Sequence, residues 1–118
     1  MKQIYKILSL KSLILSIFIL FMGTSIYAET TFEKIKRTGK VTVGTEAAFP
    51  PFEFVEDGKI VGYGKDILDY IIADLGVELN QLDLPWQGIL PGVLAGKFDF
   101  VATSVSIRAE RAKKYAFT

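Results

Sequence analysis

A cluster of hydroxyl side chains followed by an arginine stands near the end of this 118-residue sequence. Thr103, Ser104 and Ser106 come directly after an apolar stretch, and Arg111 follows them on a short amphipathic segment. Hydroxyls, main-chain N–H groups at a helix start and a guanidinium are together the groups that bind a small carboxylate. The pattern therefore predicts an anion-binding turn.

Three further side chains have the chemistry to complete such a site. Glu46 can face a cation, Phe49 precedes the rigid Pro50-Pro51 pair, and Trp86 offers a second aromatic face. An acid, two aromatics, hydroxyls and an arginine on one rim predict a site for a small zwitterion with an apolar or cationic side chain.

The sequence around these residues alternates between strand-like and helix-like segments. Strands are predicted at 40–45, 77–83 and 98–102, helices at 32–37 (with Thr31 as its cap), 66–75 and 86–95, and a hairpin at 52–61 with Asp57-Gly58 as its turn. Strands separated by helices of this length predict βαβ units, so the expected fold class is α/β with a small, mostly parallel sheet flanked by helices. Ligands bind beyond the carboxyl ends of such strands, and the loops 46–52, 84–87 and 103–111 are expected to meet on that rim.

Two acids have structural explanations and are left out of the site. Asp66 stands where a helix is predicted to begin, and a carboxylate there would cap free N–H groups and meet the positive end of the helix dipole. Asp99 lies at a junction between a loop and a strand, and we interpret it in the same structural way.

Composition excludes several classes of protein. The sequence has no Cys and no His, which argues against a disulfide framework, against zinc or copper sites and against Ser–His or Cys–His catalysis. Residues 29–118 hold eleven of the fourteen basic residues and all thirteen acidic ones, a net charge of −2, so nucleic acid is not an expected partner. No cofactor, metal or catalytic residue is predicted.

The first 28 residues have the features of a secretory signal peptide. Three lysines precede an apolar run at 13–23, and small residues lead to Ala28, ahead of the charged Glu29. A membrane anchor is the alternative, but the run is shorter than the roughly twenty residues that spanning requires. We therefore expect a chain exported to the periplasm or the cell-surface side of the membrane, with residues 29–118 forming one modest domain.

Seven ordered motifs carry a family resemblance. They are Val41-Thr-Val-Gly-Thr45, Phe49-Pro-Pro-Phe52, Gly62-Tyr-Gly-Lys-Asp66, Trp86-Gln-Gly-Ile-Leu-Pro91, Gly96-Lys-Phe-Asp99, Ser106-Ile-Arg-Ala-Glu-Arg111 and Phe117. This series resembles the family 3 periplasmic solute-binding proteins, the polar amino-acid receptors of ATP-driven importers. The resemblance implies a type II fold of two α/β lobes that close on the ligand. Residues 29–118 would then be a partial N-terminal lobe, the first segment of lobe 1, with no counterpart of the second lobe or the returning segment.

The resemblance also implies roles for the polar candidates. Arg111 matches the arginine that clamps the ligand α-carboxylate, and Ser106 matches a residue whose N–H and hydroxyl complete that clamp. Ser104 and Thr103 match positions that contact the ligand's ammonium or carboxylate. The structural alternatives are a surface arginine on a basic helix, and a strand-end turn that satisfies its own backbone.

The remaining candidates would form the walls of the site. Phe49 and Trp86 match aromatic residues that sandwich the ligand side chain, although buried aromatics are more often part of a core. Glu46 lies near a position that is acidic in receptors for basic amino acids, a match that is either geometric or accidental. No metal ligand or catalytic group follows from the resemblance.

The function implied is the substrate-binding component of an amino-acid importer, with a membrane permease as partner and a monomeric full-length protein. A dehydratase of the cyclohexadienyl or arogenate type on the same scaffold is one alternative, and a sensor module of a larger signalling protein is another. We also expect strand 98–102 to present an unpaired apolar edge. Residues 29–118 alone are expected to be marginally stable and to bind amino acids weakly or not at all.

Overall fold

The computed structural model describes residues 28–118, and the predicted signal peptide lies outside them except for its last residue. The elements of this part are, in order, α2 (Thr31–Thr38), β1 (Lys40–Thr45), β2 (Ala48–Phe49), β3 (Glu53–Glu56), β4 (Lys59–Val61), α3 (Tyr63–Leu75), β5 (Glu78–Asp83), α4 (Trp86–Leu94), β6 (Phe100–Val101) and α5 (Ala109–Ala112). Among these described helices, none has the length and apolar character needed to cross a bilayer.

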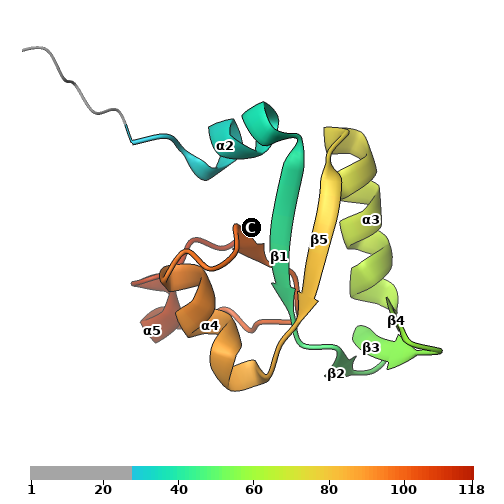
Figure 1. Ribbon diagram of the computed structural model, residues 1–118. Coiled ribbons are helices and arrows are strands. Elements are labelled where there is room, and N and C mark those ends of the chain that lie inside the picture. Colours follow the sequence, from blue (N-terminus) through green and yellow to red (C-terminus); the bar gives the residue numbers. More distant parts are fainter. Residues whose placement is uncertain (1–27) are drawn as a thin grey trace, which may run out of the picture.

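The main sheet is parallel and has three strands in the order β5-β1-β6 (Figure 1). Six residues of β1 pair with six of β5, from Lys40 opposite Glu78 to Thr45 opposite Asp83. β6 is shorter than the predicted 98–102, and only Phe100 and Val101 pair with β1. The α/β class and the parallel sheet flanked by helices are confirmed.

A second, antiparallel sheet lies at the carboxyl end of β1. The predicted hairpin is present as β3 and β4, and its turn residues Asp57 and Gly58 both have positive φ (48° and 75°), as a two-residue turn of this kind requires. β2, which was not predicted, adds a third strand by pairing Ala48 with Phe54 and Phe49 with Glu53. A strand of two residues has too little alternation to be seen in a sequence.

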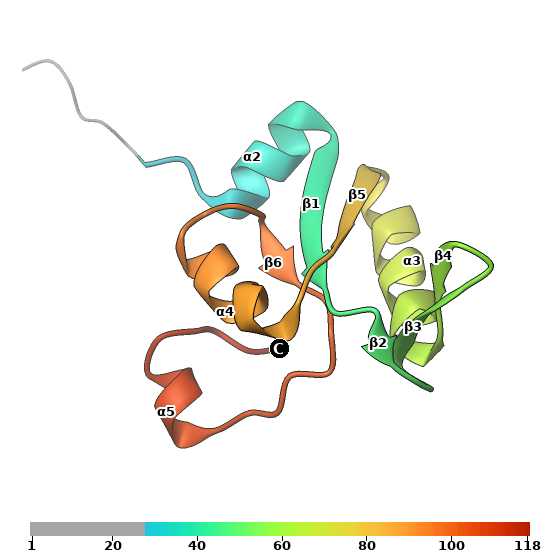
Figure 2. The ribbon, with the colours of Figure 1, turned by 60° about the horizontal axis from the view of Figure 1, so that its bottom comes forward.

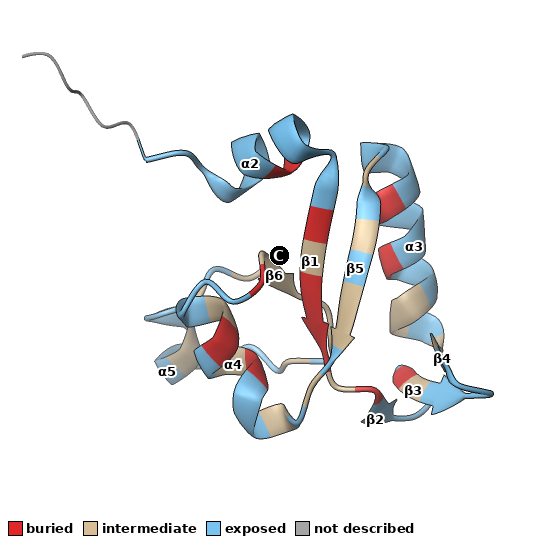
Figure 3. Cartoon of the chain, viewed as in Figure 1, coloured by how far each residue is buried: buried red, intermediate tan, exposed pale blue. Residues whose placement is uncertain are grey.

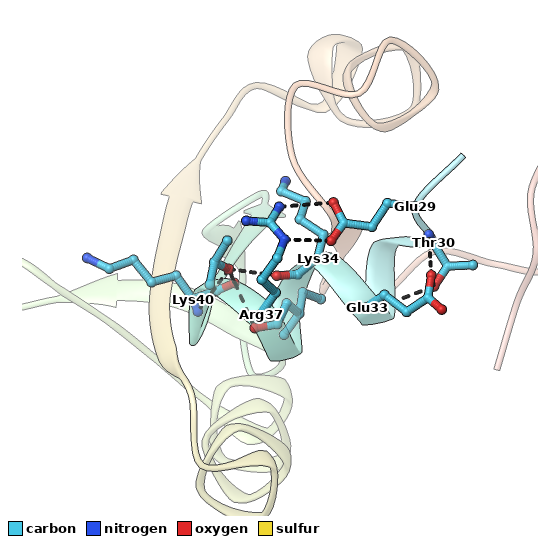
Figure 4. A network of polar contacts seen from close by, with 8 residues as sticks. Glu29, Thr30, Glu33, Lys34, Arg37 and Lys40 are labelled. Carbon is cyan, nitrogen blue, oxygen red and sulfur yellow. Dashed lines mark hydrogen bonds and ion pairs between the residues drawn. The ribbon is translucent and has the colours of Figure 1, made fainter. Parts of the chain in front are cut away.

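The first helix begins one residue earlier than predicted. Thr30, and not Thr31, is its N-cap: the Thr30 hydroxyl accepts from the Glu33 N–H (3.2 Å), and the Glu33 carboxylate accepts from the Thr30 N–H (2.9 Å) (Figure 4). This reciprocal pair is a capping box. The predicted end of the helix is confirmed, because Gly39 adopts the left-handed conformation with φ of 65°.

The start of α3 was also predicted too late. The helix begins at Tyr63, so Asp66 lies within its first turn and its side chain caps nothing. Instead, the Tyr63 N–H donates to the Pro51 carbonyl (3.0 Å) and the Gly64 N–H to the Phe52 carbonyl (2.9 Å). The hairpin segment thus supplies the acceptors that an isolated helix would need from a capping side chain.

The core lies on both faces of β1 (Figure 3). On one face, Val41 and Val43 are fully buried against Leu68 and Ile72 of α3. Fully burying side chains of this kind contributes roughly 1.5–3 kcal/mol each. The two helices α3 and α4 pack against opposite faces of this sheet, as Figures 1 and 2 show together.

On the face of β1 toward α4, an aromatic ring lies very close to the backbone of both the strand and the helix. The Phe98 ring lies against Gly44 of β1 and Gly92 of α4, and a Cβ at either glycine would come within 2.6 Å and 2.5 Å of ring carbons. Ile89 of α4 is fully buried on the same side. The absence of side chains at both glycines is what lets strand, ring and helix stack.

Asp99 fixes the start of β6. One carboxylate oxygen pairs with Lys34 Nζ of α2 (2.7 Å), and the other accepts from the Thr42 N–H (2.8 Å). Burial acts to raise the pKa of Asp99, but the hydrogen bonds from Lys34 and from the Thr42 main chain outweigh it and hold the pKa below its ordinary value. The structural interpretation of Asp99 is confirmed.

Candidate ligand-binding site

Hydrogen bonds tie the carboxyl ends of the three parallel strands to one another. The Leu84 N–H, just after β5, donates to the Thr45 carbonyl at the end of β1 (2.8 Å). The Thr45 hydroxyl in turn donates to the Ala102 carbonyl after β6 (2.8 Å). The Ala47 N–H completes the junction by donating to an oxygen of Asp83 (2.9 Å). The three loops that were predicted to share a rim therefore leave the sheet from one bonded junction, which Figure 2 brings forward.

Arg111, Ser106 and Trp86 come together on this rim. The Arg111 guanidinium lies over the Trp86 ring, with 5.3 Å from Cζ to the ring centre, and its Nη1 donates to the Ser106 carbonyl (3.0 Å). Arginine stacked on an indole is held by cation–π attraction and keeps its remaining N–H donors free to point elsewhere. This geometry suits a carboxylate clamp.

The position of Arg111 also bears on the alternative that it is only a surface arginine on a basic helix. Its neighbours Arg108, Lys113 and Lys114 are exposed, whereas Arg111 is half-buried beside Trp86. The Arg111 guanidinium is held by the Trp86 ring and the Ser106 carbonyl, so it is less mobile than a freely solvated surface arginine. The surrounding positive charge also favours an anion at this end of the rim.

Thr103 and Ser104 have a partner that the sequence did not reveal. The Thr103 hydroxyl and the Ser104 N–H donate to Glu53 Oε2 (3.2 and 3.3 Å), and the Ser104 hydroxyl lies 3.4 Å from both carboxylate oxygens. Glu53, on β3, is only 4% exposed. Residues 103–106, called the hydroxyl turn below, are thus held against the hairpin by a buried carboxylate.

One signal in the sequence could have pointed to Glu53. Gly62 and Gly64 bracket the start of α3, and such paired glycines indicate that other atoms approach closely. A Cβ on Gly64 would overlap with Glu53 Oε1, and one on Gly62 would overlap with the Phe52 carbonyl oxygen. The glycines mark the space that the carboxylate and the hairpin backbone occupy.

The aromatic candidates do not form one sandwich. Phe49 stacks on Phe52 with ring centres 5.5 Å apart and planes 18° apart, and both rings are partly open to solvent. Trp86 lies with Arg111 instead, and no ring contact joins Phe49 to Trp86 in the described part of the chain. Phe49 is exposed and Trp86 is half-buried, so neither is a fully buried core residue, and their role as walls around a ligand side chain stays a prediction.

Glu46 stands directly after β1 and is half-buried. Within residues 28–118 its side chain makes no hydrogen bond or ion pair, whereas the next residue, Ala47, is fixed to Asp83. The backbone around Glu46 is thus held in place while its carboxylate keeps its acceptor capacity. Its contact with a ligand cation stays a prediction.

Across residues 28–118, no three His, Cys, Asp or Glu side chains gather closely enough to hold a metal ion.

Several curated proteins are similar in sequence. The L-cystine-binding protein TcyJ of Escherichia coli K12 is 35% identical over 91 residues, which are 76% of this chain and 34% of that protein. The arginine-binding protein ArgT of Corynebacterium glutamicum is 33% identical over 86 residues, or 72% of this chain and 28% of that protein. This chain spans about a third of the length of the curated relatives that it matches.

Solved structures share the fold. The arginine-bound form of domain 1 from TmArgBP, from T. maritima, superposes with a TM-score of 0.65 at 42% identity, covering 68% of this chain and 64% of that one. An ancestral amino-acid-binding protein described as a precursor of cyclohexadienyl dehydratase gives a TM-score of 0.67 at 34% identity, covering 72% and 38%.

A family model extends over most of the described residues. Residues 41–118, from the start of the sheet through the hydroxyl turn and Arg111, match the model of the bacterial extracellular solute-binding proteins, family 3. The chain therefore belongs to the family 3 bacterial extracellular solute-binding proteins.

Proposed function

We propose that this chain supplies one side of the binding site of an amino-acid receptor that serves an ATP-driven importer. The observation that carries the proposal is the Arg111 guanidinium, held between the Trp86 ring and the Ser106 carbonyl at the carboxyl ends of the parallel strands. The names of the relatives, which include cystine-binding and arginine-binding proteins, support an amino acid as the ligand.

The α-carboxylate of the ligand would lie against Arg111. A guanidinium presents its donors in a planar fork that matches a carboxylate, and one donor already used on Ser106 leaves the others for the ligand. Stacking on Trp86 reduces the number of side-chain conformations that binding must restrict. Together, these features favour Arg111 over its exposed basic neighbours as the clamp.

The ligand side chain would extend toward the aromatic and acidic residues of the rim. Phe49, stacked on Phe52, presents an apolar surface there, and the Glu46 carboxylate would attract a cationic group. These contacts suit an amino acid with an apolar or cationic side chain. They also leave one side of the ligand uncovered.

A second lobe would cover that side, and the ligand would stabilise the closed arrangement through contacts made only there. A membrane permease would then recognise the closed form. Domain 1 of TmArgBP, described in an arginine-bound form, supports the idea that a first lobe can carry much of the recognition.

An enzymatic role has weaker support. The curated relatives are binding proteins by name, and the ancestral precursor of a dehydratase is itself described as an amino-acid-binding protein.

The test is an NMR titration of the chain with each of the common amino acids at millimolar concentration. Because residues 29–118 carry the Arg111 clamp but no second lobe, the proposal requires weak binding rather than none, and at least one amino acid should shift the amide signals of Ser106 and the side-chain signal of Arg111 in this millimolar range. Arg111→Ala should weaken binding by about thirtyfold or more, because the ligand carboxylate loses its charged partner. Arg108→Ala, on an exposed arginine three positions away, is the matched control and should change the affinity less than about twofold. Binding that survives Arg111→Ala, or no response to any amino acid, would contradict the proposal.

A further inference from the structure

The Glu53 carboxylate has an unusual environment. It is 4% exposed, and no lysine or arginine in the described part of the chain forms an ion pair with it. A buried carboxylate without a cation needs several donors to offset its lost hydration. Here the donors are the Ser104 N–H and the hydroxyls of Thr103 and Ser104, and the nearby start of α3 adds its positive dipole end.

These contacts decide the direction of two hydrogen bonds. An ionised carboxylate only accepts, so each hydroxyl that bonds to it must donate its single proton to it. The Thr103 and Ser104 hydroxyls are then left with lone pairs alone. Toward any further partner they act as acceptors.

The opposite situation holds at the other end of the same turn. The Ser106 carbonyl receives a bond from Arg111, whose remaining N–H groups are all donors. One end of the turn therefore offers acceptors, and the other offers donors. A zwitterion has matching groups at its α-carbon: an ammonium that donates and a carboxylate that accepts.

We infer that Glu53 is a positioning residue that fixes the Thr103 and Ser104 hydroxyls as acceptors, so that this end of the turn takes the ligand ammonium while Arg111 takes its carboxylate. The inference rests on the proposed amino-acid binding. According to this inference, Glu53 lies outside the ligand site but determines whether the site prefers amino acids to simple carboxylic acids. Glu53 acts through the two hydroxyls and not by touching the ligand.

The experiment compares two probes on the chain: L-arginine, and 5-guanidinopentanoate, which has the same side chain and carboxylate but no α-ammonium. Glu53→Gln keeps the shape but replaces one acceptor oxygen by a donor NH₂. Both hydroxyls and the Ser104 N–H then compete for one oxygen, and a hydroxyl can accept from the NH₂ instead, which uses the lone pair meant for the ammonium. We expect the affinity for L-arginine to fall about tenfold and that for 5-guanidinopentanoate to change less than about twofold. Glu56→Gln, an exposed acid on the same strand, is the control and should change neither.

A second variant tests the inference even if Glu53→Gln fails to fold. Thr103→Val removes one acceptor without altering the carboxylate, and it should lower the L-arginine affinity while sparing the des-amino probe. The amide proton shift of Ser104 reports independently whether its bond to residue 53 has weakened.

The outcomes separate the two proposals. Equal weakening of both probes by Glu53→Gln would show a merely structural role and overturn the inference, as would an unchanged ratio in Thr103→Val. Failure of the wild-type chain to bind either probe or any other amino acid would instead overturn the proposed function, and the inference with it.

Discussion

The two ends of the hydroxyl turn are held by opposite charges in different surroundings. At one end, the buried Glu53 carboxylate receives bonds from Thr103 and Ser104 beneath the start of α3. At the other, the half-buried Arg111 guanidinium donates to Ser106 and rests on Trp86. The first end depends on three distant segments packing together, and the second on contacts at the surface. We therefore expect substitutions at the Glu53 end to lower the free energy of unfolding, and substitutions at the Arg111 end to lower mainly the affinity for the ligand.

The largest effect should come from filling the space beside Glu53. Gly64→Ala would place a Cβ where Glu53 Oε1 now lies, so the carboxylate must leave its position and its bonds to the turn. The free energy of unfolding should fall by about 3 kcal/mol, from overpacking and from donors left without a partner. Chemical denaturation measures the change.

Gly88→Ala in α4 is the matched control, because nothing apart from its chain neighbours and the backbone of its own helix lies within 4 Å of the position that its Cβ would take. It should leave stability unchanged or raise it by up to about 1 kcal/mol, as alanine favours a helix. Equal losses in the two variants would mean that the contact with Glu53 does not matter.

A smaller effect is expected at Asp99, which fixes the strand leading into both ends of the turn. Asp99→Asn should lower the free energy of unfolding by about 2 kcal/mol, because charged hydrogen bonds to Lys34 and Thr42 become neutral or are lost. Since the pKa of Asp99 is lowered in the folded chain, its contribution is fully present above the ordinary value of 3.8 and is lost as pH falls through the folded pKa.

The difference in stability between wild type and Asp99→Asn should therefore shrink as the pH is lowered below 3.8. Urea unfolding at a series of pH values measures it. Asp74→Asn, an exposed acid on α3, serves as the control. A difference that stays constant across the acid range would argue against an ionised Asp99 as the cause.

The Arg111 end should respond with little change in stability. Arg111→Ala removes a half-exposed cation–π contact, for which about 1 kcal/mol is the expected cost. Trp86 is the sole tryptophan of the sequence, so its fluorescence should change when the guanidinium leaves the ring. Arg108→Ala should leave the emission as it is. A loss of stability as large as that in Gly64→Ala would remove the distinction between the two ends.

The smallest effect on folding should come from the open side of β6. An apolar groove lies there between α3 and α4, lined by Ile67, Ile71, Leu90 and Val93, and it reaches Thr103 and Ser104 but not Arg111. An unpaired strand edge with apolar walls favours self-association. Raising the protein concentration should therefore shift the NMR signals of Ser104 while leaving those of Arg111 in place.

Ile67→Lys should reduce this association with little cost in stability, because the side chain is already 45% exposed. Tyr70→Lys, on an exposed position of α3 outside the groove, should have no such effect. Sedimentation velocity distinguishes the two. Association that Ile67→Lys does not alter would place the contact elsewhere.

Local patterns predicted most of the fold. The Asp57-Gly58 turn and the order of strands and helices depend on residues close in sequence, and they were predicted correctly. The start of α3 was not, because its first N–H groups are satisfied by Pro51 and Phe52 of another element. β2 was missed for a similar reason, since so short a strand exists only through its pairing with β3.

The candidate site divides in the same way. Arg111, Ser106 and Trp86 were predicted from residue type and motif, and the structure brings them together. Glu53 was missed because the alternation of its strand does not reveal that an acid is buried, and the paired glycines at 62 and 64 indicate only that some atom approaches closely. Its role depends on Gly64 and on the turn at Thr103 and Ser104, which are distant in sequence.

The stacking of Phe98 between Gly44 and Gly92 has a consequence for how this sequence can evolve. Because a Cβ at either glycine would collide with the ring, the three positions share one fixed volume. A substitution to alanine at either glycine should be accepted only alongside a smaller side chain at Phe98. Aligned homologous sequences should therefore show these three positions changing together, with the combined size of their side chains nearly constant.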